Sequence, residues 1–224
     1  MSEPPASVVY RLPLFPLPLV LFPGAAVPLH IFEPRYRQLL VDVQAGDGRF
    51  GIVVPDGDAP ALGVVGCEAH VRDVEPLPDG RSNLTVDGGR RFAVVALVDA
   101  GTPYATADVT PYDDDPEVDE DRRLVRDAVA RVRDLFRRVS AAAATIGDSD
   151  DPPPELPDDP GELAFAAAAR VQFELAARQR ILASRSPLER LEIVGDLLER
   201  GVAGIEERAA THVRARSNGR GPHA

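Results

Sequence analysis

Lysine is absent from this chain of 224 residues, so all 25 of its basic residues are arginine. A Walker A loop needs a lysine that contacts the nucleotide phosphates, and a Schiff-base enzyme needs a lysine amine as its nucleophile. The composition therefore excludes both of these enzyme classes for this chain.

Cysteine and long apolar runs are also scarce. Cys67 is the only cysteine, which excludes an internal disulfide and favours a reducing compartment. No run of 18 uninterrupted apolar residues is long enough for a membrane span. The apolar segment near the N-terminus contains too many prolines for the helix of a signal peptide. We therefore expect a cytoplasmic protein with no membrane partner.

Positive charge is in short supply as well. The formal net charge is −11, and residues 1–112 contain 13 acids and 8 arginines, against 23 acids and 17 arginines in residues 113–224. Affinity for nucleic-acid phosphates requires a positively charged face. Only a few arginines could form one, namely Arg90, Arg91, Arg214, Arg216 and Arg220. The charge therefore disfavours nucleic acid as a partner.

The most informative stretch is Leu12–Tyr36, which combines a dense apolar run with closely spaced prolines. Proline lacks a backbone N–H and fixes φ, so we expect short extended pieces joined by turns rather than one helix. Pro23-Gly24 marks a reversal, and Ala26–Phe32 has the pattern of a buried strand. A helix is expected from Pro34 to about residue 45, because proline is favoured at the first helical position.

The rest of the N-terminal half alternates short β-branched segments with turn sequences. The turn sequences include the dipeptides Asp56-Gly57, Asp79-Gly80 and Asp87-Gly88. Such turns indicate an antiparallel meander, and six or seven strands at this spacing favour a closed or nearly closed barrel. The further strands are expected at Phe50–Val54, Gly63–Val74, Ser82–Val86, Arg91–Val98 and Tyr104–Thr110.

Beyond Pro111 the apolar residues recur at helical spacing. Helices are expected at about 117–145, at 161–183, and from Pro187 to about Glu207, the last with a capping box that begins at Ser186.

The predicted organisation has two parts. A β domain with one short helix spans 8–112, and a helical domain of three helices spans 113–216. Within the second part, residues 147–160 contain six acids and five prolines, so we expect a flexible or extended acidic loop. Residues 1–7 and 217–224 are expected to be flexible tails.

The order LPLFPL…LFPGAAVPLHIFEPRYRQL resembles the opening of the Lon N-terminal domain family, also called the Lon substrate-binding domain. The resemblance extends through Gly63–Val71, Pro78–Arg81, Gly88–Phe92 and Leu188–Leu191, and covers roughly residues 8–205. It implies an α+β fold, in which a PUA-like pseudo-barrel β domain is followed by a helical bundle.

The resemblance also implies a function. Members of this family engage protein substrates, so we expect a non-catalytic, protein-binding module of protein quality control that recognises exposed or unfolded polypeptide segments. The Lon peptidase domain uses a Ser–Lys dyad, which a chain without lysine cannot contain. We therefore expect a stand-alone domain without the ATPase and peptidase domains, and not an enzyme.

Residues with catalytic or metal-binding chemistry are few. Cys67 and His70 have CxxH spacing, but residues three apart on a strand point to opposite faces. His30 has no acid at a helpful spacing, and the acids of 113–115 and 148–151 lack the ligand spacing of an EF-hand. We predict no catalytic residues, no metal and no cofactor.

Polypeptide-binding residues are expected near the first helix and on one strand. Phe32 and Tyr36 flank the start of the helix, and Arg91 and Phe92 begin a strand that matches the family pattern. In the competing interpretation, Phe32 and Phe92 belong to the core and Arg91 caps the barrel.

Three alternative functions remain at this stage: a regulatory small-ligand domain, an RNA-binding PUA-like domain, and an enzyme whose site is not recognisable. A deep polar cleft in which His30 meets carboxylates would favour the enzyme, and an apolar groove would favour polypeptide binding.

Overall fold

The computed structural model describes residues 8–57, 60–115 and 121–219. The chain divides into two compact units, which are residues 1–115 with 168–185, and residues 116–167 with 186–224. We call them the β unit and the helical unit. The expected organisation had a single boundary after residue 112, whereas here residues 168–185 group with the strands. The expected tail 1–7 lies outside the described residues.

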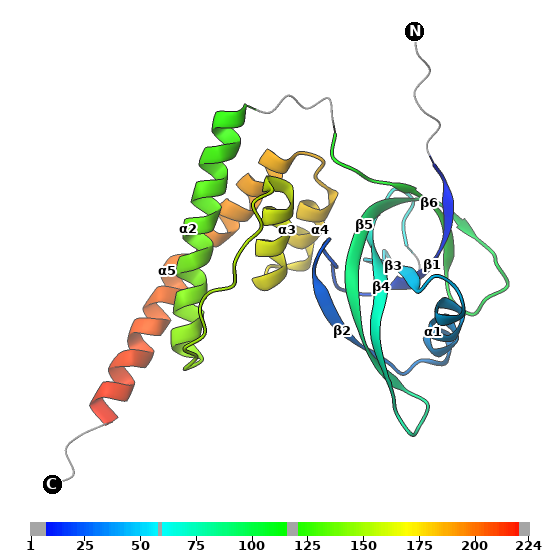
Figure 1. The fold of residues 1–224 in the computed structure, drawn as a ribbon, viewed down its shortest axis with the longest axis horizontal. Coiled ribbons are helices and arrows are strands. Elements are labelled where there is room, and N and C mark those ends of the chain that lie inside the picture. Colours follow the sequence, from blue (N-terminus) through cyan, green and yellow to red (C-terminus); the bar gives the residue numbers. More distant parts are fainter. Residues whose placement is uncertain (1–7, 58–59, 116–120, 220–224) are drawn as a thin grey trace. The chain divides into compact units, whose positions relative to one another are not determined.

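The β unit contains a sheet of six strands, ordered β2-β5-β4-β3-β1-β6, and β6 pairs in turn with β5. Five strands therefore close a ring, as the strand spacing predicted, and β2 extends β5 outside it (Figure 1). The expectation of a simple meander is wrong in one respect, because β1 and β3 are parallel. The bounds are β1 (Tyr10–Pro16), β2 (Ala26–Ile31), β3 (Arg49–Val53), β4 (Val65–Pro76), β5 (Ser82–Val98) and β6 (Thr106–Pro111).

The turn expected at Asp87-Gly88-Gly89 does not form, since β5 continues through it as one strand of 17 residues. A Cβ added at Gly88 would lie 2.0 Å from the carbonyl oxygen of Phe22, and one at Gly89 would lie 2.4 Å from Nε2 of His70. Gly88 therefore permits close approach of a second backbone, and Gly89 leaves room for the His70 ring. As a result, the first half of β5 pairs with β2 and the second half with β6.

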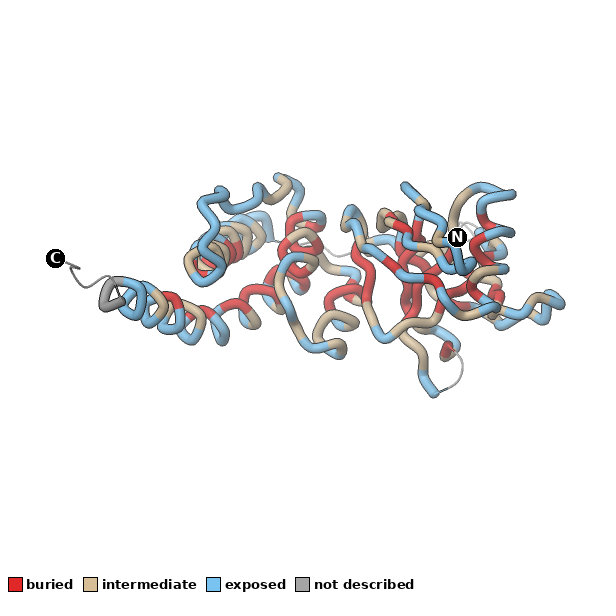
Figure 2. Tube along the Cα trace, turned by 90° about the horizontal axis from the view of Figure 1, so that it is seen from below, coloured by how far each residue is buried: buried red, intermediate tan, exposed pale blue. Residues whose placement is uncertain are grey.

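The core of the ring is built from alternate residues of its strands (Figure 2, red). Phe92 is its largest member, and its ring occupies space that two glycines leave open: a Cβ at Gly51 or Gly66 would lie 2.5 or 2.6 Å from the ring. The cluster contains Leu12, Leu14, Val53, Phe92, Val94, Ala107 and Val109.

Two prolines of the opening stretch occupy positions where a backbone N–H is not needed. The predicted helix is confirmed as α1 (Pro34–Ala45), with proline in its first turn. Pro28 lies within β2, opposite Thr85. The Gly88 N–H donates to the Ala25 carbonyl at 2.8 Å, so Ala25 and Gly88 form a hydrogen-bonded pair. Along an antiparallel ladder such pairs alternate with non-hydrogen-bonded pairs, the first of which here is Ala26–Asp87. Pro28 occupies the next non-hydrogen-bonded pair, so its nitrogen faces away from β5 and no ladder bond is lost.

The predicted second helix is two helices, α3 (Pro160–Arg170) and α4 (Leu175–Ala183). The expectation of one continuous helix over 161–183 is therefore wrong. Arg178 on α4 donates to the carbonyls of Ala168 and Val171, at 3.1 and 3.4 Å. A guanidinium thus binds the carbonyls that a continuous helix would have satisfied internally.

The helical unit is dominated by α2 (Arg122–Ile146) and α5 (Pro187–Gly219). Arg131 bonds Asp196 at 2.9 Å, Arg138 bonds Glu206 at 2.9 Å, and Asp148, just after α2, bonds Arg216. The partners advance together along both helices, which are therefore parallel and lie side by side (Figure 1).

The start of α5 is as predicted, since the Ser186 hydroxyl accepts the Glu189 N–H at 3.0 Å, the first bond of the capping box. Its end is not, because the helix continues past Glu207 to Gly219. Buried Ala209 extends its apolar stripe, and Arg216 on the added turns bonds Asp148. The expected tail is therefore helical over 217–219, while 220–224 lie outside the described residues.

The acidic loop forms no helix or strand over 147–159, consistent with its composition. Arg133 on α2 donates to the carbonyls of Leu156 and Pro157, at 3.2 and 2.6 Å, and pairs with Asp158 at 3.0 Å. The second half of the loop is thereby attached to α2.

Replacing Gly88 by alanine tests whether close approach maintains the long strand. The added Cβ would overlap a carbonyl oxygen, so we expect Gly88→Ala to lower the free energy of unfolding by about 2 kcal/mol or more. Gly201→Ala is the matched control, because nothing lies within 4 Å of its Cβ position, and in a helix it should be neutral or stabilising by up to about 1 kcal/mol. Urea denaturation measures both, and equal effects would contradict the role assigned to Gly88.

Candidate functional site

The four predicted polypeptide-binding residues do not form one surface. Phe92 is fully buried in the barrel core. Tyr36 is 5% exposed, and its ring lies 4.1 Å from that of Phe15 between centroids. A partner cannot contact these two rings directly, so the competing interpretation holds for Phe92, which is a core residue.

Arg91 is a buried structural residue of the β unit. Its guanidinium donates to the carbonyls of Leu182 and Ser184, at 2.8 and 2.5 Å, and pairs with Asp114 at 2.5 Å. The hydroxyl of Tyr112 donates to the neighbouring Ala183 carbonyl at 3.0 Å. Arg91 therefore attaches the end of α4 to β5, and we exclude it as a residue that binds polypeptide.

Phe32 differs from the other three, because 56% of its surface is exposed. It follows β2, and its ring stacks on that of His30, with centroids 6.0 Å apart and planes inclined by 24°. The competing interpretation of Phe32 as a core residue is therefore wrong, and its role in polypeptide binding stays a prediction.

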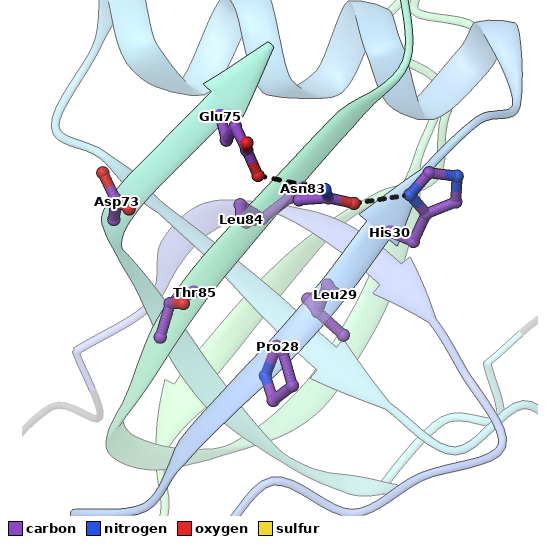
Figure 3. A pocket seen from close by; sticks show the side chains of 8 residues that line it. All are labelled: Pro28, Leu29, His30, Asp73, Glu75, Asn83, Leu84 and Thr85. Carbon is purple, nitrogen blue, oxygen red and sulfur yellow. Dashed lines mark hydrogen bonds between the residues drawn. The ribbon is translucent and has the colours of Figure 1, made fainter. Parts of the chain in front are cut away.

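A groove of about 280 Å³ lies on the outer face of β2, β5 and β4, next to this pair (Figure 3). Residues that lie opposite one another on the three strands line it in two rows, the first of which contains His30, Asn83 and Glu75. In the first row, Asn83 Nδ2 donates to Glu75 at 3.1 Å. The Asn83 oxygen must then be the atom that faces Nδ1 of His30 at 2.7 Å, so Nδ1 is the donor. The second row contains Pro28, Thr85 and Asp73.

The sequence did not reveal this groove, because a bulge in β4 determines its lining. The pairing of β4 with β5 shifts between Val71 and Asp73. The extra residue, Arg72, turns Asp73 and Glu75 to the outer face beside Thr85 and Asn83. Strict alternation from Val71 would place both acids on the inner face, so only the observed register shows that they share the outer face with His30.

The groove does not have the geometry of a general-base site. His30 faces an amide rather than a carboxylate, and Thr85, the hydroxyl in the lining, lies two residues along β5 from Asn83. No nucleophile is thus brought to the imidazole. The groove is open, and its acids are exposed, so it resembles a surface for binding more than a closed reaction site.

A second polar cluster joins β1, β3 and β4 around Glu68, which is only 3% exposed. Glu68 accepts from the Tyr10 hydroxyl at 2.6 Å and from Arg49 at 3.2 Å, and His70 lies 3.5 Å away. Burial and this hydrogen bond to Glu68 raise the pKa of the Tyr10 hydroxyl. The bonds satisfy the buried carboxylate, which makes the cluster a cross-strand structural element.

The other residues considered for catalysis or metal binding do not form a site. Cys67 is buried and His70 exposed, so the CxxH pair does not converge, and burial raises the pKa of the Cys67 thiol. Within the described residues, no three His, Cys, Asp or Glu side chains are grouped as a metal would require. Over the same residues, no helix has the length and apolar character needed to cross a membrane.

Comparison with known proteins gives a consistent match over most of the chain. The family model for the ATP-dependent protease La (LON) substrate-binding domain matches residues 11–200. Lon protease of Escherichia coli strain K12 is 26% identical over 209 residues, which cover 88% of this chain and 26% of that protein. Lon protease of Anaeromyxobacter dehalogenans is 28% identical over 201 residues, covering 84% and 23%. The chain thus spans about a quarter of the length of these relatives.

Solved structures agree with the fold. A Lon N-terminal domain protein from Xanthomonas campestris is 25% identical, with a TM-score of 0.57, and the match covers 82% of this chain and 95% of that one. The N-terminal domain of Mycobacterium avium complex Lon protease is 21% identical, with a TM-score of 0.64 and coverages of 85% and 98%.

The structural assignment of Arg91 can be tested against its neighbour. Arg91→Met removes the buried guanidinium from two carbonyls and from the partly exposed Asp114 carboxylate, so we expect a loss of about 3 kcal/mol in the free energy of unfolding. Arg90→Met is the matched control, because the Arg90–Asp113 pair is exposed on both sides and should contribute less than about 1 kcal/mol. Denaturation midpoints that shift equally for both variants would refute the assignment.

Proposed function

Because the chain belongs to the family of the ATP-dependent protease La (LON) substrate-binding domain, we propose that it binds exposed or unfolded segments of other proteins without acting on them chemically. The same membership supports a role in protein quality control in the cytoplasm. The substrates are polypeptides, and no cofactor takes part in the binding.

The observation that carries the proposal is the exposure of Phe32 beside the groove. A phenylalanine ring is usually buried, whereas this one leaves 56% of its surface to solvent and stacks on His30 at the end of β2. Exposed aromatic rings of this kind act as anchors in protein interfaces. The adjoining groove adds apolar surface from Pro28 and polar groups that can bond a polypeptide backbone.

The expected affinity is low. The groove is open, and a flexible segment must lose conformational freedom when it binds, which offsets much of the contact energy. We therefore expect dissociation constants that are micromolar or weaker, corresponding to about −8 kcal/mol or less favourable.

The alternative functions have less support. Asp73 and Glu75 line the groove, and the chain has a net charge of −11, which opposes binding of RNA phosphates. A regulatory small ligand would normally be enclosed over most of its surface, whereas this groove is open. An enzyme would need a nucleophile near His30, and the lining offers none within reach.

Replacing Phe32 by alanine tests the proposal. Titration of a fluorescently labelled, permanently unfolded protein should show micromolar or weaker binding, and Phe32→Ala should weaken it about five-fold or more, as expected for an anchor worth about 1 kcal/mol. Leu62→Ala is the matched control, because Leu62 is an even more exposed apolar residue of the same unit, at 68%, and lies outside the groove.

Three results would contradict the proposal: no binding of unfolded protein by the parent chain, tighter binding of a labelled single-stranded RNA, or peptide hydrolysis that is lost in His30→Ala. An equal loss of binding in Leu62→Ala and Phe32→Ala would remove Phe32 as the anchor. Far-UV circular dichroism of each variant separates a lost contact from a lost fold.

A further inference from the structure

Acidic side chains in the β unit are usually paired with arginine. Six of them form such pairs on its surface, namely Asp108 with Arg11, Glu33 with Arg35, Asp47 with Arg49, Asp79 with Arg81, Asp87 with Arg72, and Asp113 with Arg90. The acids of the groove are different. Glu75 bonds only the Asn83 amide, and Asp73 has no bonded partner among the described residues.

The same strand shows the contrast directly. Arg72 is the bulged residue of β4, and its guanidinium turns to Asp87 through two hydrogen bonds. It therefore does not neutralise Asp73, its immediate neighbour. Within the described residues, no arginine pairs with either carboxylate of the groove, whereas Asp87 on the neighbouring strand is neutralised by Arg72.

Apolar surface borders these carboxylates. Pro28 lies in the second row with Asp73, while Phe32 stacks on His30 at the end of the first row. Neighbouring strands are about 4.8 Å apart, so Glu75 on β4 and the His30–Phe32 pair on the β2 side are separated by roughly 10 Å. In an extended segment, side chains two or four residues apart lie on the same face, about 7 or 13 Å from each other, and so bracket that distance.

We propose that the groove selects polypeptide segments in which arginine or lysine lies two or four residues from an aromatic or aliphatic side chain. This inference rests on the proposed function and specifies its substrate class. The cationic group bonds Asp73 and Glu75, while the apolar side chain packs on Phe32 beside His30. Asn83, which holds Glu75 on one side and His30 on the other, keeps the carboxylate in place for the incoming cation.

Charge also decides which segments are rejected. An acidic segment would meet two carboxylates and a strongly negative chain, and like charges at close range oppose binding. The selectivity should therefore depend on salt, since the groove is open to solvent and its charges are screened.

Three labelled, unstructured peptides of equal length test the inference. Each is built on glycine and serine with two phenylalanines, and each phenylalanine is followed both two and four residues later by arginine, glutamine or glutamate. Fluorescence anisotropy at low salt should rank their affinities in that order, with about a ten-fold difference between the arginine and glutamate peptides. Added salt should reduce the difference.

The double variant Asp73→Asn with Glu75→Gln tests the site. It should weaken binding of the arginine peptide about five-fold and leave the glutamine peptide unchanged. The matched control is Glu192→Gln with Glu207→Gln, which removes the same two charges from exposed residues of α5. This control should leave both peptides unaffected.

The outcomes separate the inference from the proposed function. If the three peptides bind equally, or if the control variant weakens the arginine peptide as much as the groove variant does, the groove does not select basic segments, although polypeptide binding stands. If neither the peptides nor a permanently unfolded protein binds the parent chain, both proposals fail together.

Discussion

The architecture of the β unit depends on the close approach between β5 and the backbone that precedes β2. At Gly88 the carbonyl of Phe22 occupies the position that any side chain would fill, and bonds to Gly24 and Ala25 hold the two segments together. This contact lets a single strand exchange one neighbour for another along its length. Closure of the barrel and the outward extension of β2 both follow from it, and so does the surface on which Phe32 and the groove lie.

Local rules predicted the parts of the fold that local chemistry determines. Proline at the first helical position located α1, and the capping serine located the start of α5. The strand through Gly88 and the break between α3 and α4 were missed because distant groups cause them. An Asp-Gly pair has the same local pattern whether it turns the chain or admits a backbone, and nothing in residues 161–183 indicates that Arg178 will bond carbonyls of the preceding turn.

The candidate site was predictable to a similar extent. The opening stretch indicated Phe32, but the pattern could not separate it from Tyr36, because both flank the same helix start and only tertiary packing buries Tyr36 against Phe15. Asp73 and Glu75 were not anticipated, since a bulge of one residue decides which face they occupy. The composition also did not indicate that arginines would bind the backbone. Arg91, Arg133 and Arg178 each donate to two or more backbone carbonyls, which the several donors of a planar guanidinium allow.

Pro28 has a consequence for how the sheet can meet an extended segment of another molecule. Strand β2 is the edge of its sheet, and an extended segment of another molecule that lay along it could add a strand and begin an aggregate. In the middle of that edge, where a regular strand would present an N–H, Pro28 presents none. A docking strand would find an interrupted ladder, which favours recognition through side chains on the sheet's outer face over incorporation into the sheet. The proline thus opposes the addition of a further strand at this edge.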